Sequence, residues 1–336
     1  MTRQPGLFEQ AAPPRRQKPA PGEVRPSWDS PLLQAPALPP EVKLGTSSWF
    51  FPGWRGLVYE GVYPQTALSK KGLAAYAQIP LLRTVSLDRT FYAPITTIQY
   101  AQYAAQVPDH FSFVVKAPAL VCDAVMRDEE GRGKVANPHF LDSAIAAREF
   151  VVPCLEGLQA KAGPMVFQIS PLPRGLVEES SMLIDRLAAF FEALPRELGG
   201  RRPIYALELR NAELLTPRLM KMLGNAGVRY CVGLHDRMPE VERQEVALRA
   251  LDGDTSGDLV VRWNLHRGFL YQAAKQRYEP FDRLVDEDLE TRRTLARMAA
   301  RASKAGRKVW ITANNKAEGS APLSLLRLAE EIASRL

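Results

Sequence analysis

Five charged residues have the types that acid–base and anion-binding chemistry require: Asp88, Lys116, Glu208, Arg210 and Arg262. Glu208 is the leading candidate for a general acid or base, with Asp88 second. Lys116 could act as a base or a Schiff-base amine if burial lowered its pKa; the alternative is a simple ion pair. Each arginine could bind a carboxylate or phosphate, or could bridge Glu208 or Asp88 structurally. Three cations against two carboxylates leave a positive surplus, which favours an anionic ligand.

Uncharged polar side chains could orient a substrate without doing chemistry; the candidates are Gln168, Asn264, Asn314 and Asn315. His235 could titrate near neutral pH or be a hydrogen-bonded structural histidine. Trp49 and Tyr92, together with Trp54 and Phe91, follow the first two predicted strands. These rings could stack on a sugar or a base, or they could form a small core within the loops.

Several patterns are absent, and this narrows the class of function. There is no Walker loop, no GxGxxG after a strand and no GxSxG elbow, which disfavours nucleotide cofactors and serine hydrolysis. The three cysteines and four histidines show no metal-binding spacing, so no metal ligand is assigned and the cofactor is left unknown. A net charge of +7 permits a nucleic-acid partner without requiring one.

The elements that must position these residues alternate along the chain from residue 42. Eight β-rich runs are expected to be strands: Val42–Ser48, Thr84–Asp88, Ser112–Lys116, Met165–Ile169, Ile204–Leu209, Tyr230–Leu234, Leu259–Trp263 and Val309–Ala313. Helical patterns separate them, at about 66–78, 95–106, 138–160, 177–194, 213–225, 240–250, 286–305 and 322–335. This alternation predicts parallel βαβ units, and eight of them predict an α/β fold of the (β/α)8 TIM-barrel type over residues 41–336.

The alternation within each strand predicts which side chains face the barrel interior. In Ile204–Arg210, for example, one face is apolar and the other becomes polar at its C-terminal end. Six residues end such interior faces and should reach a common cavity at the C-terminal mouth, where barrel enzymes keep their chemistry: Ser86, Lys116, Gln168, Glu208, Arg262 and Asn314.

Residues 1–40 have a different composition, with ten of the 27 prolines and several basic residues. We expect them to form a disordered tail. Within it, Gln4-Pro5-Gly6-Leu7-Phe8 resembles the Gln-x-x-Leu-Phe peptide by which bacterial DNA-associated proteins dock on the sliding clamp. Gln4, Leu7 and Phe8 are therefore candidate clamp contacts.

The strand ends also carry a family resemblance. The chain resembles the YecE-like family, also called domain of unknown function 72, in an ordered series of segments over about residues 42–336: Gly45-Thr46-Ser47-Ser48-Trp49, Thr90-Phe91-Tyr92, Phe113-Val114-Val115-Lys116, Phe167-Gln168, Glu208-Leu209-Arg210, Val261-Arg262 and Asn314-Asn315. The resemblance implies a TIM barrel and no established activity. The family commonly has Glu-x-Asn where Ser86-Leu87-Asp88 stands, so a general base at that glutamate would be lost here or moved to Asp88. It also commonly has His-x-x-Trp where this chain has Asn211 and Leu214.

Three functional hypotheses follow. The first is an enzyme that binds a small anionic or polyhydroxylated substrate at the barrel mouth. The second is a DNA-associated protein, of repair or nuclease-like type, docked on the sliding clamp through Gln4–Phe8. The third is a non-catalytic binding module, which the Ser86 departure from the family keeps open.

No apolar run is long enough to span a membrane and no signal-peptide core is evident, so we expect a cytoplasmic protein.

Overall fold

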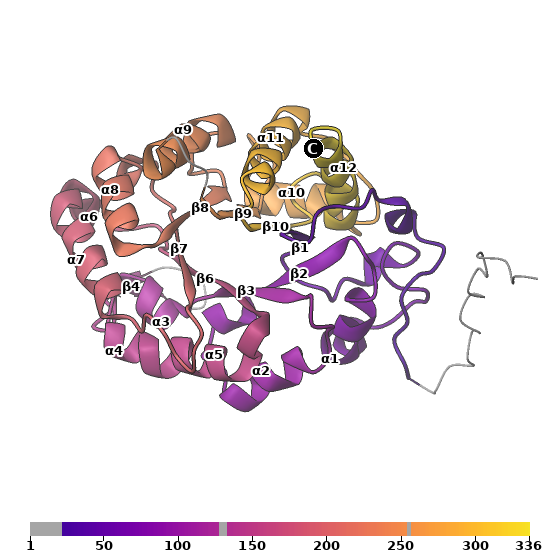
Figure 1. Ribbon diagram of the computed structural model, residues 1–336, viewed down its shortest axis with the longest axis horizontal. Coiled ribbons are helices and arrows are strands. Elements are labelled where there is room, and N and C mark those ends of the chain that lie inside the picture. The colour runs from indigo at the N-terminus through magenta and orange to yellow at the C-terminus, as the bar shows by residue number, and fades with distance from the viewer. Residues whose placement is uncertain (1–21, 128–132, 254–256) are drawn as a thin grey trace, which may run out of the picture.

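The computed structural model describes residues 22–127, 133–253 and 257–336, and its core is a closed barrel of eight parallel strands (Figure 1). Around the ring the order is β1-β10-β9-β8-β7-β6-β3-β2. The strands are β1 (Val42–Thr46), β2 (Leu82–Leu87), β3 (Ser112–Lys116), β6 (Ala162–Gln168), β7 (Ile204–Glu208), β8 (Arg229–Leu234), β9 (Leu259–Trp263) and β10 (Val309–Ala313). The prediction of eight strands and a (β/α)8 barrel is therefore confirmed.

The helices that cover the barrel correspond to the predicted ones. They are α1 (Gln65–Tyr76), α2 (Thr97–Ala104), α4 (Ser143–Ala146) continuing through a π turn into α5 (Val152–Leu158), α7 (Ser180–Ala193), α8 (Pro217–Ala226), α9 (Val241–Asp252), α11 (Leu289–Lys304) and α12 (Ala321–Ala333). Their ends carry the expected signals. Pro217 begins α8 after the capping Thr216, and Gly227 ends it with a left-handed backbone.

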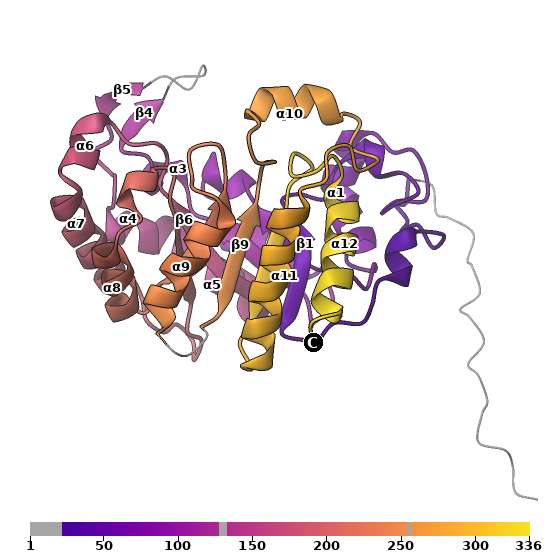
Figure 2. The same cartoon turned by 90° about the horizontal axis from the view of Figure 1, so that it is seen from above.

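Five elements in the described part of the loops at the mouth were not predicted. They are α3 (Ala119–Cys122), the antiparallel pair β4 (Val125–Arg127) and β5 (Gly133–Ala136), α6 (Arg174–Glu178) and α10 (Tyr271–Tyr278). All are short, so the hydrophobic period that identifies longer elements has too few turns to show. Figure 2 shows α10 and the β4–β5 pair at the same end of the barrel.

The barrel interior confirms the strand phase. Six side chains from six strands form an apolar layer that is separate from the core between strands and helices: Val114, Val166, Ala206, Cys231, Val260 and Trp310. Five of them precede a polar interior residue by two positions, as Val114 precedes Lys116 and Val260 precedes Arg262, while Cys231 precedes Gly233. Because side chains alternate along a strand, those polar positions lie in the next layer up, toward the mouth.

The folded part begins earlier than expected. Residues 22–40 were expected to be part of a disordered tail, but they pack on the barrel through Val24, Leu32 and Leu38. Ser30 caps a short 3-10 helix, Pro31–Gln34, by accepting a hydrogen bond from the Leu32 amide. The high proline content therefore marks an irregular but packed segment here. Residues 1–21, with Gln4, Leu7 and Phe8, lie outside the described residues.

Among the described residues, no helix combines the length and apolarity that crossing a bilayer would require.

Candidate functional site

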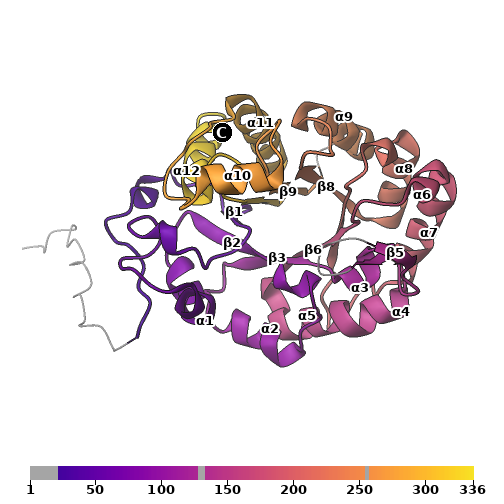
Figure 3. The same ribbon diagram turned by 180° about the vertical axis from the view of Figure 1, so that it is seen from behind.

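Charged side chains lie at the C-terminal ends of the strands, at the mouth of the barrel. Figure 3 views the barrel with α10 in front. At the centre lies Arg262, at the interior face of β9. One of its terminal nitrogens donates to Glu208 Oε2 at 2.6 Å, and the other donates to both oxygens of Asp88, at 2.9 and 2.7 Å. Glu208 ends β7, while Asp88 follows β2 on the other side of the ring. The ion pairs thus cross the barrel and connect its opposite walls.

A second arginine completes this arrangement. Arg210 lies 2.7 Å from Glu208 Oε1, and it also donates to Gln168 Oε1 at 2.8 Å. Arg262 reaches the same Gln168 oxygen at 3.3 Å, and Asn264 donates to Glu208 Oε1 at 3.4 Å. We call Gln168, Glu208, Arg210 and Arg262 the buried network, because all four are nearly inaccessible; the Glu208 side chain is 0% exposed.

Electrostatics favour ionised partners within the buried network. Burial alone would raise the pKa of Glu208, but Arg210 and Arg262 outweigh it and hold that pKa below its usual value. Burial likewise opposes the charge of Arg262, yet Asp88 and Glu208 raise its pKa further above its ordinary range. Glu208 therefore stays ionised beside the two arginines. An ionised carboxylate has no proton to give, so Glu208 is a poor proton donor to a substrate.

One residue that sequence reasoning did not single out makes room for this network. Gly233 lies at the interior face of β8, where a Cβ atom would be 2.9 Å from Glu208 Oε1 and 3.0 Å from its Cγ. Any larger residue would push the Glu208 carboxylate out of line with both arginines. A sequence signal could have indicated Gly233. It is a glycine at an interior strand position where the other strands carry polar residues.

Above the buried network lies an accessible layer, which we define as Asp88, Lys116, Phe91 and Tyr92. The Asp88 side chain is 34% exposed, and Ser86 at the end of β2 donates to its Oδ1 at 2.6 Å. Tyr92 is 85% exposed. Lys116, at the end of β3, is partly buried, with its Nζ 3.4 Å from the centroid of the Phe91 ring.

A threonine fixes the turn that carries Phe91. The Thr90 hydroxyl lies 2.7 Å from the carbonyl oxygen of Leu87 and 2.5 Å from that of Lys116. The end of β2 is thereby tied to the end of β3, so the Phe91 ring and the Lys116 side chain are positioned by the same contact.

Of the three candidate cations, Lys116 is the one that pairs with no carboxylate among the described residues. Both arginines have a carboxylate partner within 2.7 Å, whereas no hydrogen bond or ion pair from the Lys116 Nζ occurs in the described part of the chain. Burial and the neighbouring Arg262 lower the pKa of Lys116 to about 8, although Asp88 and Glu208 partly oppose this. The alternative of a simple ion pair has no carboxylate partner for Lys116 among the described residues, and the role of this lysine stays a prediction.

Of the six residues expected to reach a common cavity, five lie close together, and the cavity itself stays a prediction. Ser86, Gln168, Glu208 and Arg262 are linked by the hydrogen bonds above, and Lys116 faces the same charges. Asn314 turns toward β1 instead, where it donates to Ser47 Oγ at 2.8 Å and accepts from the Lys316 amide.

Two other candidates serve the loops. Asn315 is 1% exposed and accepts from the indole of Trp54 and from the Ala321 amide that begins α12. Trp49 is 3% exposed, and its indole donates to the Leu68 carbonyl of α1. The loop-core interpretation therefore describes Trp49 and Trp54, whereas Phe91 is partly exposed and Tyr92 is 85% exposed.

His235 adjoins the buried network from the other side. It pairs with Asp236, and burial together with Arg210 lowers the pKa of its imidazole to about 4, so it is neutral at pH 7. His235 and Asp236 line a cavity of about 260 Å³ together with residues after β9, including His266 and Arg267.

Sequence reasoning also missed Lys316, which directly follows Asn314-Asn315 and is 5% exposed. Its Nζ lies 4.3 Å from the centroid of Tyr271 in α10 and 3.3 Å from Asn314 Oδ1. Burial lowers its pKa to about 8. The residue type was a signal, but its burial depends on α10, which was itself not predicted.

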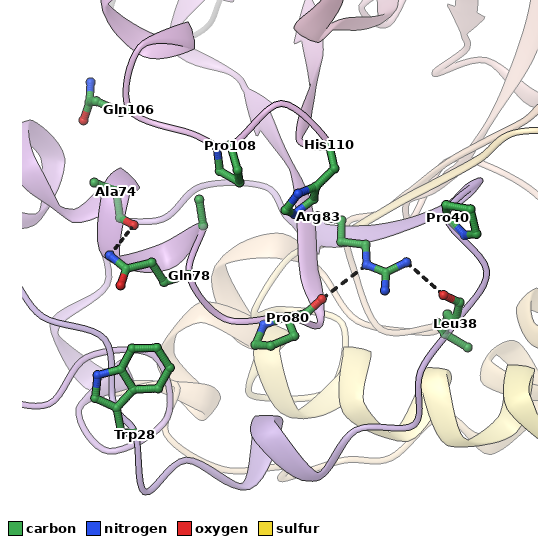
Figure 4. Close-up of a pocket in the computed structure, with 11 residues that line it drawn as sticks. Trp28, Leu38, Pro40, Ala74, Gln78, Pro80, Arg83, Gln106, Pro108 and His110 are labelled. Atoms are coloured by element: carbon green, nitrogen blue, oxygen red, sulfur yellow. Dashed lines mark hydrogen bonds between the residues drawn. The ribbon is translucent and has the colours of Figure 1, made fainter. Parts of the chain in front are cut away.

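A larger hollow, of about 750 Å³, lies at the opposite end of the barrel (Figure 4). Its lining comes from residues that precede strands, such as Pro40 and His110, and from Trp28 and α1. Arg83 donates there to the carbonyl oxygens of Leu38 and Pro80. Among the described residues that line this hollow there is no carboxylate, whereas Asp88 and Glu208 lie at the mouth.

Comparison with known proteins adds the family. A family model described as "Protein of unknown function DUF72" matches residues 43–336. A DUF72 family protein from Thermotoga maritima is 20% identical, with a TM-score of 0.57, over 87% of this chain and 99% of that one. Another from Enterococcus faecalis is 17% identical, with a TM-score of 0.56, over 87% of this chain and 95% of that one. No curated protein gives a significant match.

Proposed function

This chain belongs to the DUF72 family of proteins of unknown function, and we propose that it is an enzyme that binds a small anionic or polyhydroxylated substrate at the barrel mouth. The single observation that carries the proposal is the position of Lys116. The two arginines are committed to Asp88 and Glu208, while the Lys116 ammonium faces the mouth with no carboxylate bonded to it in the described part of the chain.

The layers assign different roles to the candidate residues. The buried network holds the strand ends in place and supplies a fixed field. Lys116 provides the charge for an anion, Asp88 is the accessible carboxylate for proton transfer, and Tyr92 offers a ring face to a sugar or another ring. Glu208 acts through the arginines rather than on the substrate.

The experiment is a panel of ligand-induced thermal shifts with phosphate, sugar phosphates and small carboxylates. We expect at least one anion to stabilise wild-type protein and to lose most of that effect in Lys116→Met, which keeps an unbranched side chain one atom shorter and removes its charge. Arg262→Ala is a poorer probe, because it also leaves two carboxylates unpaired. If no anion stabilises wild type more than it stabilises Lys116→Met, the proposal is wrong.

The second proposal, docking on the sliding clamp, rests on Gln4-Pro5-Gly6-Leu7-Phe8. A peptide of residues 1–12 should bind the clamp and lose binding when Leu7 and Phe8 become alanine. DNA binding by the full chain should weaken steeply with salt. Absence of both effects would remove this alternative, and absence of turnover despite anion binding would favour a non-catalytic binding module.

A further inference from the structure

Lys116 has surroundings that differ from those of an anion-binding lysine on a surface. We infer that its amine forms a covalent imine with the carbonyl group of a small aldehyde or ketone substrate. The inference rests on the proposed function, because it places the chemistry at the same mouth and names the substrate class.

The Lys116 amine has no hydrogen-bond acceptor within the described residues. Lys161 shows what a structural lysine looks like in this protein: its Nζ donates to the carbonyl oxygens of Ala104 and Val107 and lies 3.5 Å from Asp109. Lys116 makes no such bonds within the described residues, and its Nζ lies 3.4 Å from the centroid of the Phe91 ring. An amine that no acceptor holds in one orientation can turn its lone pair toward a substrate when it loses its proton.

The neutral form of the Lys116 amine is well populated. With a pKa of about 8, roughly a tenth of the amine is neutral at pH 7. For a lysine at its ordinary pKa that fraction is smaller by a few hundredfold. Desolvation together with a neighbouring cation is an established way to activate a lysine nucleophile. Here burial supplies the first and Arg262 the second.

The proton that the amine releases can pass to Asp88. Asp88 is held in place by Arg262 and Ser86 and remains 34% exposed. When the amine nitrogen attacks the carbonyl carbon, Asp88 can take the proton from that nitrogen and return it to the former carbonyl oxygen. The resulting carbinolamine gains one further proton from solvent and loses water as the C=N bond forms. In sum, one amine, one carbonyl and one proton give one protonated imine and one water.

Water is excluded from one side of the amine. The Phe91 ring covers one side of the amine, and the Thr90 hydroxyl fixes the turn that carries this ring. A dry face beside the nitrogen favours the loss of water that completes the imine. Asp88 is close enough for its charge to oppose the lowering of the Lys116 pKa, so both groups can act on the same substrate.

The test is reductive trapping on the full chain. Protein is incubated separately with pyruvate, glycolaldehyde or dihydroxyacetone phosphate in the presence of cyanoborohydride, and adducts are located by intact mass and peptide mapping. We expect one adduct per chain with at least one probe, mapped to Lys116 and formed faster than at Lys316, whose pKa burial also lowers to about 8 but whose Nζ lies 3.3 Å from Asn314 Oδ1. The adduct should be absent in Lys116→Met and Lys116→Arg.

Lys43 supplies the matched control, because burial also lowers the pKa of its amine but it lies at the start of β1, away from the mouth. Lys43→Met should be trapped at the wild-type rate. Labelling spread over the lysines according to their exposure, or no adduct at Lys116 with any of the three probes, would overturn the inference. Lys116→Arg separates the two proposals: it should keep anion binding while losing the adduct. Anion binding in wild type without any adduct would leave the proposed function standing and this inference refuted.

Discussion

The buried network and the accessible layer contain the same kinds of charged residues and yet differ in what they can do. Glu208 and Asp88 both pair with Arg262, but the Glu208 side chain is 0% exposed and the Asp88 side chain 34%. Glu208 is also held by Arg210, and two cations fix its ionisation. At this barrel mouth, therefore, the more deeply buried carboxylate holds the strands together, and the more exposed one stays accessible although Arg262 and Ser86 hold it.

The largest expected effect concerns the buried network, which holds the strand ends together. Glu208→Gln leaves Arg210 and Arg262 buried beside each other without their shared anion, so it should lower the free energy of unfolding by about 3 kcal/mol or more. Urea denaturation measures this. The same change at the exposed carboxylate, Asp88→Asn, should cost clearly less. Equal losses for the two variants would erase the distinction between the layers.

A smaller effect is expected from filling the space beside Glu208. Gly233→Ala places a methyl group 2.9 Å from Glu208 Oε1, which should destabilise the protein by about 1–3 kcal/mol in thermal or urea unfolding. Gly175→Ala is the matched control, because its Cβ would meet no atom within 4 Å and it lies in α6. A wild-type stability for Gly233→Ala would mean that the network is more adaptable than its geometry indicates.

Removing the charge of Lys116, in the accessible layer, should change the free energy of unfolding very little. Lys116 makes no ion pair in the described part of the chain and lies near two arginines, so Lys116→Met should change the free energy of unfolding by less than about 1 kcal/mol. The same urea experiment tests this. A loss as large as that of Glu208→Gln would give Lys116 the structural role of the buried network.

The smallest effect is a pH dependence. Because the ammonium of Lys116 loses its proton near pH 8, phosphate affinity should be full below that pH and should decline as the pH rises through about 8. Bound phosphate favours the charged amine, which moves the decline to a somewhat higher pH. Lys116→Arg should show no decline in this range, because arginine stays charged. An equal decline in that variant would assign the titration to another group.

The sequence was sufficient for the barrel and for the phase of its strands, because a period of two along Ile204–Glu208 or Leu259–Trp263 directly encodes which side faces inward. The sequence was not sufficient to predict the role of each candidate residue. Trp49 and Tyr92 have similar types in neighbouring loops, but only packing makes one 3% exposed and the other 85%. Asn314 and Asn315 likewise turn to different partners, which depend on Ser47 and Trp54 from the far end of the chain.

The central claim is that Lys116, and not the buried arginines, provides the charge that binds a ligand. Isothermal titration with phosphate at pH 7 tests it most directly, using wild type, Lys116→Arg and Lys116→Met. Wild type and Lys116→Arg should bind with similar affinity, and Lys116→Met at least about tenfold more weakly, as expected for the loss of one charge-assisted contact. Wild-type affinity in Lys116→Met would contradict the claim.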